Sequence, residues 1–317
     1  LIPFGAALRR LRPEGRVGFF LHVPFPPAAL FRTLPEADGL LRDFTAYDVI
    51  GLQTRADATN LNEALRALGL APRAEAFAVG IDAEGFAETA RRAAASAEAG
   101  RLRASLPGRA LILGVDRLDY SKGLPHRFRG FDQLLRRFPQ HRRQVTFLQV
   151  APVSRGEVAQ YRSLRRELDE LAGRINGHHA EADWVPLRWI TRTVPRGTLA
   201  GYLRLARVGL VTPLRDGMNL VAKEYVAAQD EADPGALVLS RFAGVAEMLG
   251  PEEALLVNPY DPDEIAEALD AALAMALPAR QGRWRRAAEL VRRHDAAAWS
   301  GAFLARLEAA GDAAPCP

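Results

Sequence analysis

Two cations stand five residues apart in the segment 114–125, which reads GVDRLDYSKGLP. Arg117 and Lys122 lie between an apolar run and a helix that the final proline can open. A diphosphate at this place would bind both cations and the free N–H groups of the helix start. The residues alone leave open a second interpretation, a surface ion pair between Arg117 and Asp116 or Asp119. The segment contains neither GxGxxG nor GxxxxGK[ST], so it predicts neither a dinucleotide fold nor a P-loop.

A second segment, 211–225, reads VTPLRDGMNLVAKEY and places two carboxylates around a predicted helix start. Asp216 could accept hydrogen bonds from sugar hydroxyls, and Glu224 could hold a ribose diol. The backbone N–H groups from about Gly217 to Leu220 have no acceptor within the helix and would face a bound ligand. The alternative is that Asp216 only caps the helix and that Glu224 lies on a solvated face.

Two weaker candidates are His22 and Arg174. His22 follows a predicted buried strand in GFFLHVPFP, and either serves the site at the strand end or is a structural histidine. Arg174 lies in AGRING, which is interpreted as a loop whose arginine could serve a second anion. The sequence shows no HExxH, cysteine cluster or acidic triad, so we expect no metal, and no cofactor is predicted.

Alternating strands and helices must position these residues. Short apolar, β-branched runs predict strands over nine ranges: Arg16–Val23, Tyr47–Gln53, Arg73–Gly80, Ala110–Leu118, Val145–Pro152, Pro186–Thr191, Val208–Leu214, Ala236–Phe242 and Ala254–Asn258. Amphipathic stretches predict helices at about 59–70, 84–105, 124–138, 157–172, 197–206, 220–229, 262–274, 283–293 and 296–309. Ser154 and Glu157 form a predicted capping box. This order predicts an α/β fold, in which ligands bind beyond the carboxyl ends of the strands.

Composition narrows the class of protein. The chain has 317 residues, enough for about two domains. Its 42 basic and 38 acidic residues nearly cancel, which argues against a nucleic-acid surface, and it contains no apolar run long enough to span a bilayer. Cys316 is the only cysteine, so an intrachain disulfide is excluded and a reducing, cytoplasmic setting is expected. Only Lys122 and Lys223 are lysines, which draws attention to the two segments that hold them.

Taken in order, these segments resemble the α,α-trehalose-phosphate synthase family of retaining glycosyltransferases. The resemblance spans nearly the whole chain, and DRLDYSKG and DGMNLVAKEY are its most specific parts. It implies a GT-B architecture, with two Rossmann-like domains facing a cleft. The implied domains are a partial acceptor-side domain over 1–106, a nucleotide-sugar domain over 107–277, and helices over 278–317 that cross back. Family members begin with a further stretch that does not precede Leu1 in this sequence, so the N-terminal domain is expected to be incomplete.

The resemblance also implies roles for particular residues. Arg117 and Lys122 would bind the donor diphosphate, Arg174 the acceptor phosphate, and His22 would lie near the donor sugar, with His22, Arg117, Lys122 and Asp216 as the catalytic set. The donor would also contact the five residues after Asp216, namely Gly217, Met218, Asn219, Leu220 and Val221. Glu224 would bind its ribose.

The implied reaction moves glucose with retention from UDP-glucose to glucose 6-phosphate. Two alternatives stay open: a related synthase with another phosphorylated acceptor, such as glycerol 3-phosphate, and a truncated module that binds nucleotide sugar without turnover. No nucleic acid or membrane partner is expected, and the oligomeric state, a homo-oligomer included, is left open.

Overall fold

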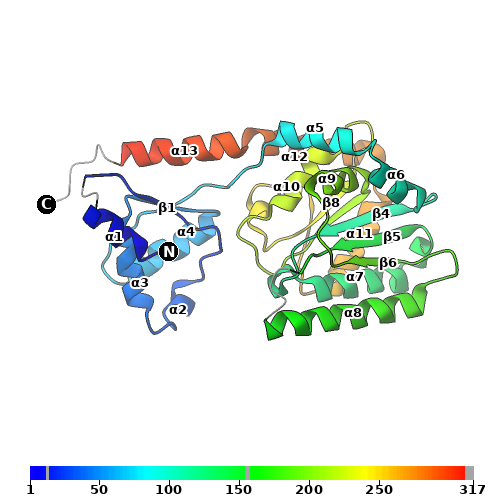
Figure 1. Cartoon of the computed structure of the whole chain (residues 1–317), viewed down its shortest axis with the longest axis horizontal. Coiled ribbons are helices and arrows are strands. Elements are labelled where there is room, and N and C mark those ends of the chain that lie inside the picture. The colour runs from blue at the N-terminus through cyan, green and yellow to red at the C-terminus, as the bar shows by residue number, and fades with distance from the viewer. Residues whose placement is uncertain (12–13, 154–157, 311–317) are drawn as a thin grey trace. The chain divides into compact units, whose positions relative to one another are not determined.

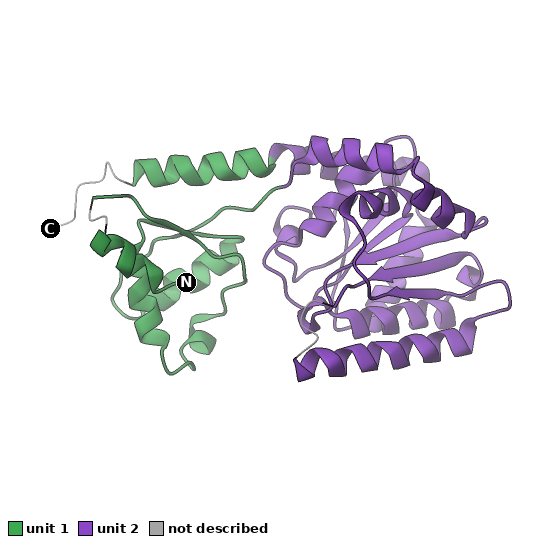
Figure 2. Ribbon diagram, in the orientation of Figure 1, with its two compact units in different colours: residues 1–80, 294–317 green, residues 81–293 purple. Residues whose placement is uncertain are grey.

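The computed structural model of the chain describes residues 1–11, 14–153 and 158–310. These residues form two compact units (Figures 1 and 2). Unit 1 comprises Leu1–Gly80 together with the segment from His294 onward, and unit 2 comprises Ile81–Arg293. The chain therefore leaves unit 1, builds the whole of unit 2 and then returns to unit 1.

Unit 1 is built on a parallel three-stranded sheet in the order β1-β2-β3, formed by Gly18–Phe20, Val49–Leu52 and Ala74–Ala76. Its helices are α1 (Phe4–Leu11), α2 (Ala28–Phe31), α3 (Ala37–Asp43), α4 (Arg55–Arg66) and α13 (Ala296–Ala309). The last helix packs on the sheet through aromatic contacts of Phe303 with Phe20 and Phe77, at ring-centroid distances of 5.8 and 5.3 Å. These contacts explain why a helix from the end of the chain belongs to this unit.

Unit 2 is built on a parallel six-stranded sheet in the order β6-β5-β4-β7-β8-β9. The strands are β4 (Ala110–Val115), β5 (Val145–Val150), β6 (Leu187–Ile190), β7 (Val208–Val211), β8 (Ala236–Ser240) and β9 (Leu255–Val257). Its helices are α5 (Ala83–Ala93), α6 (Ala97–Ala104), α7 (Leu124–Arg137), α8 (Ala159–His179), α9 (Arg196–Leu205), α10 (Leu220–Ala228), α11 (Pro262–Ala274) and α12 (Leu277–Arg293). The chain adds strands to one side of β4 and then to the other side, so the order reverses between β4 and β7.

All nine predicted strands are confirmed, each within its predicted range. The helix predicted over 84–105 is wrong in one respect, because it is two helices: α5 ends at Ala93, and the Ser96 hydroxyl caps α6 by accepting the N–H of Ala99 at 3.2 Å. The short helices α1, α2 and α3 were not predicted. The capping box at Ser154 and Glu157 lies outside the described residues.

The two units and the predicted domain limits differ over residues 81–106. The helices α5 and α6 in that range pack against α9 and α10 of unit 2. The domain limits at 106 and 277 therefore stay a prediction.

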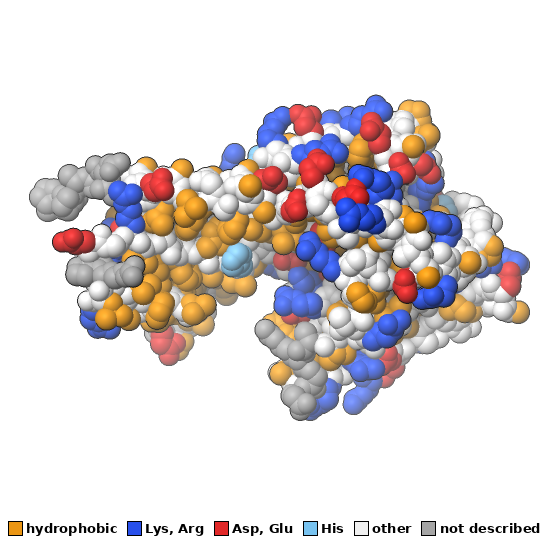
Figure 3. Space-filling view, turned by 45° about the horizontal axis from the view of Figure 1, so that its top comes forward, with side chains coloured by type: hydrophobic (Ala, Val, Ile, Leu, Met, Phe, Trp, Pro, Cys, Tyr) orange, Lys and Arg blue, Asp and Glu red, His pale blue; other side chains and the backbone are white. Residues whose placement is uncertain are grey.

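On the face drawn in Figure 3, arginines and acidic side chains are interspersed over unit 2. Among the described residues, no helix is both long and apolar enough to cross a membrane.

Candidate functional site

The two chemically promising segments follow β4 and β7, the neighbouring strands at which the sheet order reverses. Both strands are parallel, so the segments leave the sheet at the same carboxyl edge. A reversal of strand order opens a crevice at this edge, because successive connections run to opposite sides. The sheet topology therefore brings together residues that lie almost 100 positions apart in sequence, as the separation of 94 between Lys122 and Asp216 illustrates.

The two loops are tied to each other by their backbones. The carbonyl of Ser121 accepts the N–H of Leu214 at 2.8 Å. Gly123 has a φ of 66°, and a Cβ at this position would lie 2.6 Å from the carbonyl oxygen of Thr212. Only glycine tolerates both the left-handed conformation and this close approach. The loops consequently hold a fixed spacing beyond the strand ends.

Lys122 and Asp216 are in direct contact across these loops. Lys122 Nζ donates to Asp216 Oδ2 at 2.5 Å, and both side chains are largely buried, with 13% and 17% exposure. Asn219 Nδ2 donates to the same oxygen at 3.0 Å. Within the described part of the chain, Asp216 Oδ1 accepts no hydrogen bond, which leaves it available to a ligand hydroxyl.

The start of α10 leaves donors unused beside this carboxylate. Asn219 has a φ of 71° and caps α10 through its side-chain oxygen, which accepts the N–H of Ala222 at 3.3 Å. Gly217, Met218 and Asn219 are buried, yet their backbone N–H groups donate to none of the described residues. Buried N–H groups usually have partners, so these groups are suited to an anionic ligand. The interpretation of Asp216 as the helix cap is wrong, because Asn219 takes that position.

Arg117 is exposed and forms no hydrogen bond or ion pair with the residues that the structure describes. The partners proposed for it in a surface ion pair are otherwise engaged. Asp116 pairs with Arg127, and Asp119 accepts hydrogen bonds from the N–H and hydroxyl of Ser121 at 2.9 and 2.8 Å. The ion-pair alternative is therefore wrong, and Arg117 is free to meet an anion.

Arg127, a fully buried arginine of α7 beneath the two loops, was not predicted from the sequence. It donates to the Asp116 carboxylate, to Thr212 Oγ1 at 3.0 Å and to Gln149 Oε1 at 2.9 Å. Burial raises the pKa of Asp116, and the charge of Arg127 opposes this effect. These bonds join the ends of β4, β5 and β7. A charged residue on the apolar face that holds Leu124, Phe128 and Phe131 was the signal that could have found it.

Glu224 lies one turn into α10, and Arg196 Nη2 of α9 donates to its Oε1 at 3.1 Å. Its side chain is 21% exposed, so the interpretation as a solvated face residue is wrong. Burial raises the pKa of Glu224, and the paired arginine acts against this shift. The neighbouring residues Leu220 and Val221 are exposed and half-buried at the start of the helix.

Lys223, the second of the two lysines, is fully buried. Burial lowers its pKa from 10.5 to about 8. It is therefore a buried amine, whose charged form burial disfavours, rather than a free surface cation.

His22 lies in unit 1 and is exposed just after β1. Gln53 Oε1 accepts the N–H of Val79 at 3.0 Å, which turns the Gln53 amide nitrogen toward His22 Nδ1 at 3.3 Å. In the neutral ring, Nδ1 is then the acceptor and Nε2 carries the proton. The ring also contacts Phe20 in a tilted arrangement, with centroids 4.7 Å apart and an interplanar angle of 45°.

The loop predicted around Arg174 is wrong, because α8 continues to His179 and Arg174 is an exposed helical residue. Asn176, two positions later, exchanges hydrogen bonds of 2.9 and 3.0 Å with Leu187 at the start of β6. Arg174 thus lies toward the amino edge of the sheet, and the structure does not bring it together with Lys122 and Asp216.

Residues 1–309 match the profile of "Glycosyltransferase family 20". A "Trehalose-6-phosphate synthase" of Sinorhizobium fredii is 46% identical over 326 residues, which cover 98% of this chain and 70% of that protein.

Two similar solved structures hold ligands. One is an α,α-trehalose-phosphate synthase (UDP-forming) from Burkholderia xenovorans in complex with glucose-6-phosphate, with a TM-score of 0.93, 42% identity, and coverage of 97% of this chain and 71% of that chain. The other, from E. coli and bound with UDP-2-fluoro glucose, also has a TM-score of 0.93 and 42% identity, and covers 100% of this chain and 72% of that chain. These likenesses confirm the predicted α/β fold class of GT-B type.

Proposed function

Because the chain belongs to glycosyltransferase family 20, we propose that it is a hexosyltransferase that moves glucose with retention from UDP-glucose to glucose 6-phosphate. The products are α,α-trehalose 6-phosphate and UDP. The observation that carries this proposal is the contact of Lys122 with Asp216 beside the N–H groups of Gly217 to Asn219, which donate to none of the described residues. One place then offers cations and N–H groups for a diphosphate and a carboxylate for sugar hydroxyls.

In the proposed reaction, the bond from the anomeric carbon of glucose to the UDP oxygen breaks. A new bond forms on the same face, from that carbon to the anomeric oxygen of glucose 6-phosphate. The proton of the acceptor hydroxyl passes to the departing phosphate oxygen. Arg117, Lys122 and the helix-start N–H groups stabilise the negative charge that develops on the diphosphate, since such donors act strongly where charge forms.

The remaining site residues have proposed roles as well. Asp216 binds glucose hydroxyls through Oδ1, and Glu224 binds the ribose while Arg196 holds its carboxylate. Lys122 keeps its contact with Asp216 and turns further N–H groups of its ammonium to the phosphate, because an ammonium group has three donors. His22 is proposed to act near the donor sugar. We propose no role for Arg174 in the reaction, because it lies toward the amino edge of the sheet.

Release of UDP in a coupled assay, with UDP-glucose and glucose 6-phosphate, tests the reaction. We expect turnover and a product whose two anomeric protons are both α by NMR. Turnover only with glycerol 3-phosphate would identify a synthase with another acceptor. Calorimetric binding of UDP-glucose without release would indicate a binding module, and absence of UDP binding by the folded chain would overturn the site.

A substitution separates the sugar from the nucleotide. Asp216→Asn should leave the affinity for UDP unchanged and weaken that for UDP-glucose. Equal losses for both ligands would contradict its assignment to the sugar. Asp169→Asn, on the exposed side of α8, is the matched control.

We also propose that the enzyme works in the cytoplasm, because its single cysteine fits a reducing compartment. Sedimentation of the purified chain would determine whether it forms a homo-oligomer.

A further inference from the structure

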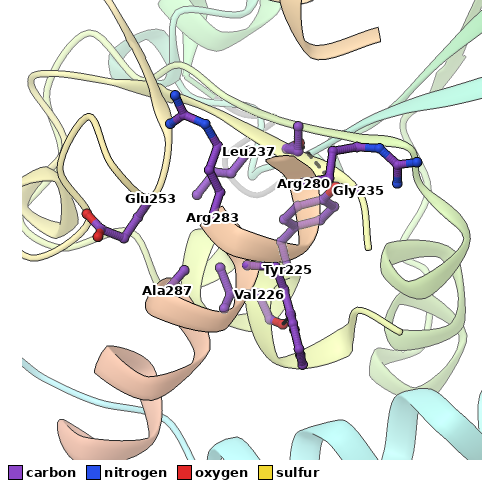
Figure 4. Close-up of a pocket in the computed structure, with 10 residues that line it drawn as sticks. Tyr225, Val226, Gly235, Leu237, Glu253, Arg280, Arg283 and Ala287 are labelled. Carbon is purple, nitrogen blue, oxygen red and sulfur yellow. Dashed lines mark hydrogen bonds between the residues drawn. The ribbon is translucent and has the colours of Figure 1, made fainter. Parts of the chain in front are cut away.

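Unit 2 contains a second polar region, at the amino edge of its sheet. There a cavity of about 300 Å³ lies between the end of α6, the end of α9 and the starts of β4 and β7. Its lining combines the arginines Arg103, Arg109 and Arg207 with the apolar side chains of Leu106, Leu111 and Leu205. By contrast, a cavity beside α10 and α12 measures about 10 Å³, which is room for about one water (Figure 4).

The arginines around the larger cavity outnumber the acids. Arg109 Nη2 donates to Asp183 at 3.2 Å, but Asp183 also pairs with Arg143 at 3.0 Å. Both terminal nitrogens of Arg207 donate hydrogen bonds of 3.1 Å to the Asp233 carboxylate. Asp233 also pairs with Arg280 at 2.6 Å. Arg143 also pairs with Glu181 at 2.9 Å, so the excess positive charge among these pairs lies with Arg207 and Arg280, which share one carboxylate.

Two further guanidinium groups have no acidic partner among the described residues. Arg103 donates to the carbonyl of Ala94 at 3.2 Å, and Arg188 donates to the hydroxyl and carbonyl of Ser105 at 2.6 and 2.9 Å. Burial lowers the pKa of Arg188, and the nearby charge of Arg109 adds to this effect. The positive charges thus repel one another at this edge.

Arginines at helix ends have an ordinary explanation, since they offset the partial negative charge of the last carbonyls. Here α6 and α9 each contribute about half a negative charge at the cavity. The two positive charges of Arg103 and Arg188 already exceed the negative charge of the two helix ends, even without the arginines that share a carboxylate. Helix ends alone do not account for the arginines.

We propose that this cavity binds a small phosphate-bearing anion at the edge of the sheet opposite the candidate donor site. Guanidinium forks bind phosphate through paired N–H donors, and the leucines exclude water from the rest of the ligand. The volume accommodates a free phosphate or a sugar phosphate. Gly108 has a φ of 68°, and a Cβ at this position would meet no other atom within 4 Å, so the backbone leaves the rim open. This site is independent of the proposed donor chemistry.

The test uses the full chain with Arg117→Ala and Lys122→Ala introduced to silence the donor site. Calorimetric titration with inorganic phosphate should show saturable binding. Arg103→Gln and Arg109→Gln should each weaken it about tenfold or more, because each removes a charge-assisted contact. Arg165→Gln, an exposed arginine of α8 that pairs with Asp169, should leave it unchanged. Crystals soaked in tungstate should show anomalous density inside the cavity.

A parallel titration with glucose 6-phosphate distinguishes the source of the phosphate. The proposed acceptor site also binds glucose 6-phosphate, so only the binding that Arg103→Gln and Arg109→Gln remove is compared. Within that part, tighter binding than that of inorganic phosphate identifies a sugar phosphate, and equal binding identifies the free anion. The proposal is overturned if phosphate does not bind, if Arg103→Gln and Arg165→Gln bind alike, or if the tungstate lies elsewhere. Because the donor site is silenced in every arm, failure here leaves the proposed transferase function untouched.

Discussion

The two edges of the six-stranded sheet use positive charge in different ways. At the carboxyl edge, Arg127 and Lys223 are fully buried, and Lys122 is held against Asp216 by loops that bond to each other. At the amino edge, arginines are partly exposed and surround an open cavity. The first arrangement fixes the positions of the charged side chains, and the second supplies a positive electrostatic potential. A reaction that must place atoms needs the former, whereas binding of an anion needs only the latter.

The largest expected effect tests whether buried charge organises the carboxyl edge. Arg127→Met leaves Asp116 buried without its cation, so the free energy of unfolding in urea should fall by about 3–5 kcal/mol. Arg129→Met in the same helix, whose ion pair with Glu167 is exposed, should cost less than about 1 kcal/mol. Similar losses in the two variants would show that the buried charge of Arg127 does not organise the carboxyl edge.

The buried lysine predicts a dependence on pH. The pKa of Lys223 is about 8 in the folded chain and 10.5 in an ordinary lysine, so the unfolded chain holds this proton more tightly. Stability therefore rises with pH between about 8 and 10.5, by up to roughly 3 kcal/mol relative to Lys223→Met. Urea denaturation of both proteins across this range measures it. Parallel curves would mean that Lys223 keeps an ordinary pKa.

Arg117, the exposed cation of the carboxyl edge, should affect the binding of UDP but not the stability of the fold. Arg117→Ala should weaken UDP binding by about 1.5–3 kcal/mol, as should Lys122→Ala, because each removes a charge-assisted contact with the diphosphate. Arg117→Ala should leave the urea midpoint unchanged, since this side chain has no ion pair among the described residues. Unchanged UDP affinity in both variants would return these residues to a surface role. Arg165→Ala is the control.

The helix start gives a smaller effect. Asn219→Ala removes the cap of α10 and puts alanine at a φ of 71°, a left-handed conformation that asparagine adopts more readily, which should cost about 0.5–2 kcal/mol of stability. Asn219→Gly restores the backbone freedom and should cost only a few tenths. A glycine variant as unstable as the alanine one would assign the loss to the contact with Asp216 instead.

At the amino edge, the smallest change is expected. Arg207→Gln breaks an ion pair whose side chains are 30% and 56% exposed, so thermal and urea unfolding should change by less than about 1 kcal/mol. A loss above about 2 kcal/mol would show that this edge is organised like the other one.

Sequence patterns predicted the residues that chain order places directly after strands. The segments after β4 and β7 were found because parallel strands produce apolar runs that end abruptly at polar loops. The short helices α1 to α3 were missed, since fewer than nine residues carry too little periodicity. Arg174 was misplaced because the glycines on either side of it suggested a loop, whereas α8 tolerates both on its exposed side.

Other features depend on contacts between distant positions. Arg127 was missed because its partners Asp116, Gln149 and Thr212 come from three strands, and no local pattern relates them. The arginines of the amino edge were equally hidden, being scattered over 103–207 among many others. Sequence predicted the chemistry of the site better than the means by which it is held.

The division of the chain has a consequence for its synthesis. Unit 2 is one continuous stretch inserted between two parts of unit 1. It can complete its sheet as it leaves the ribosome, whereas Phe20 and Phe77 of unit 1 gain their contacts with Phe303 of α13 only when more than 200 further residues have been made. Folding of the insert shortens the loop that separates those parts and so reduces the entropy lost when they meet. Unit 2 is therefore expected to fold before unit 1 is complete.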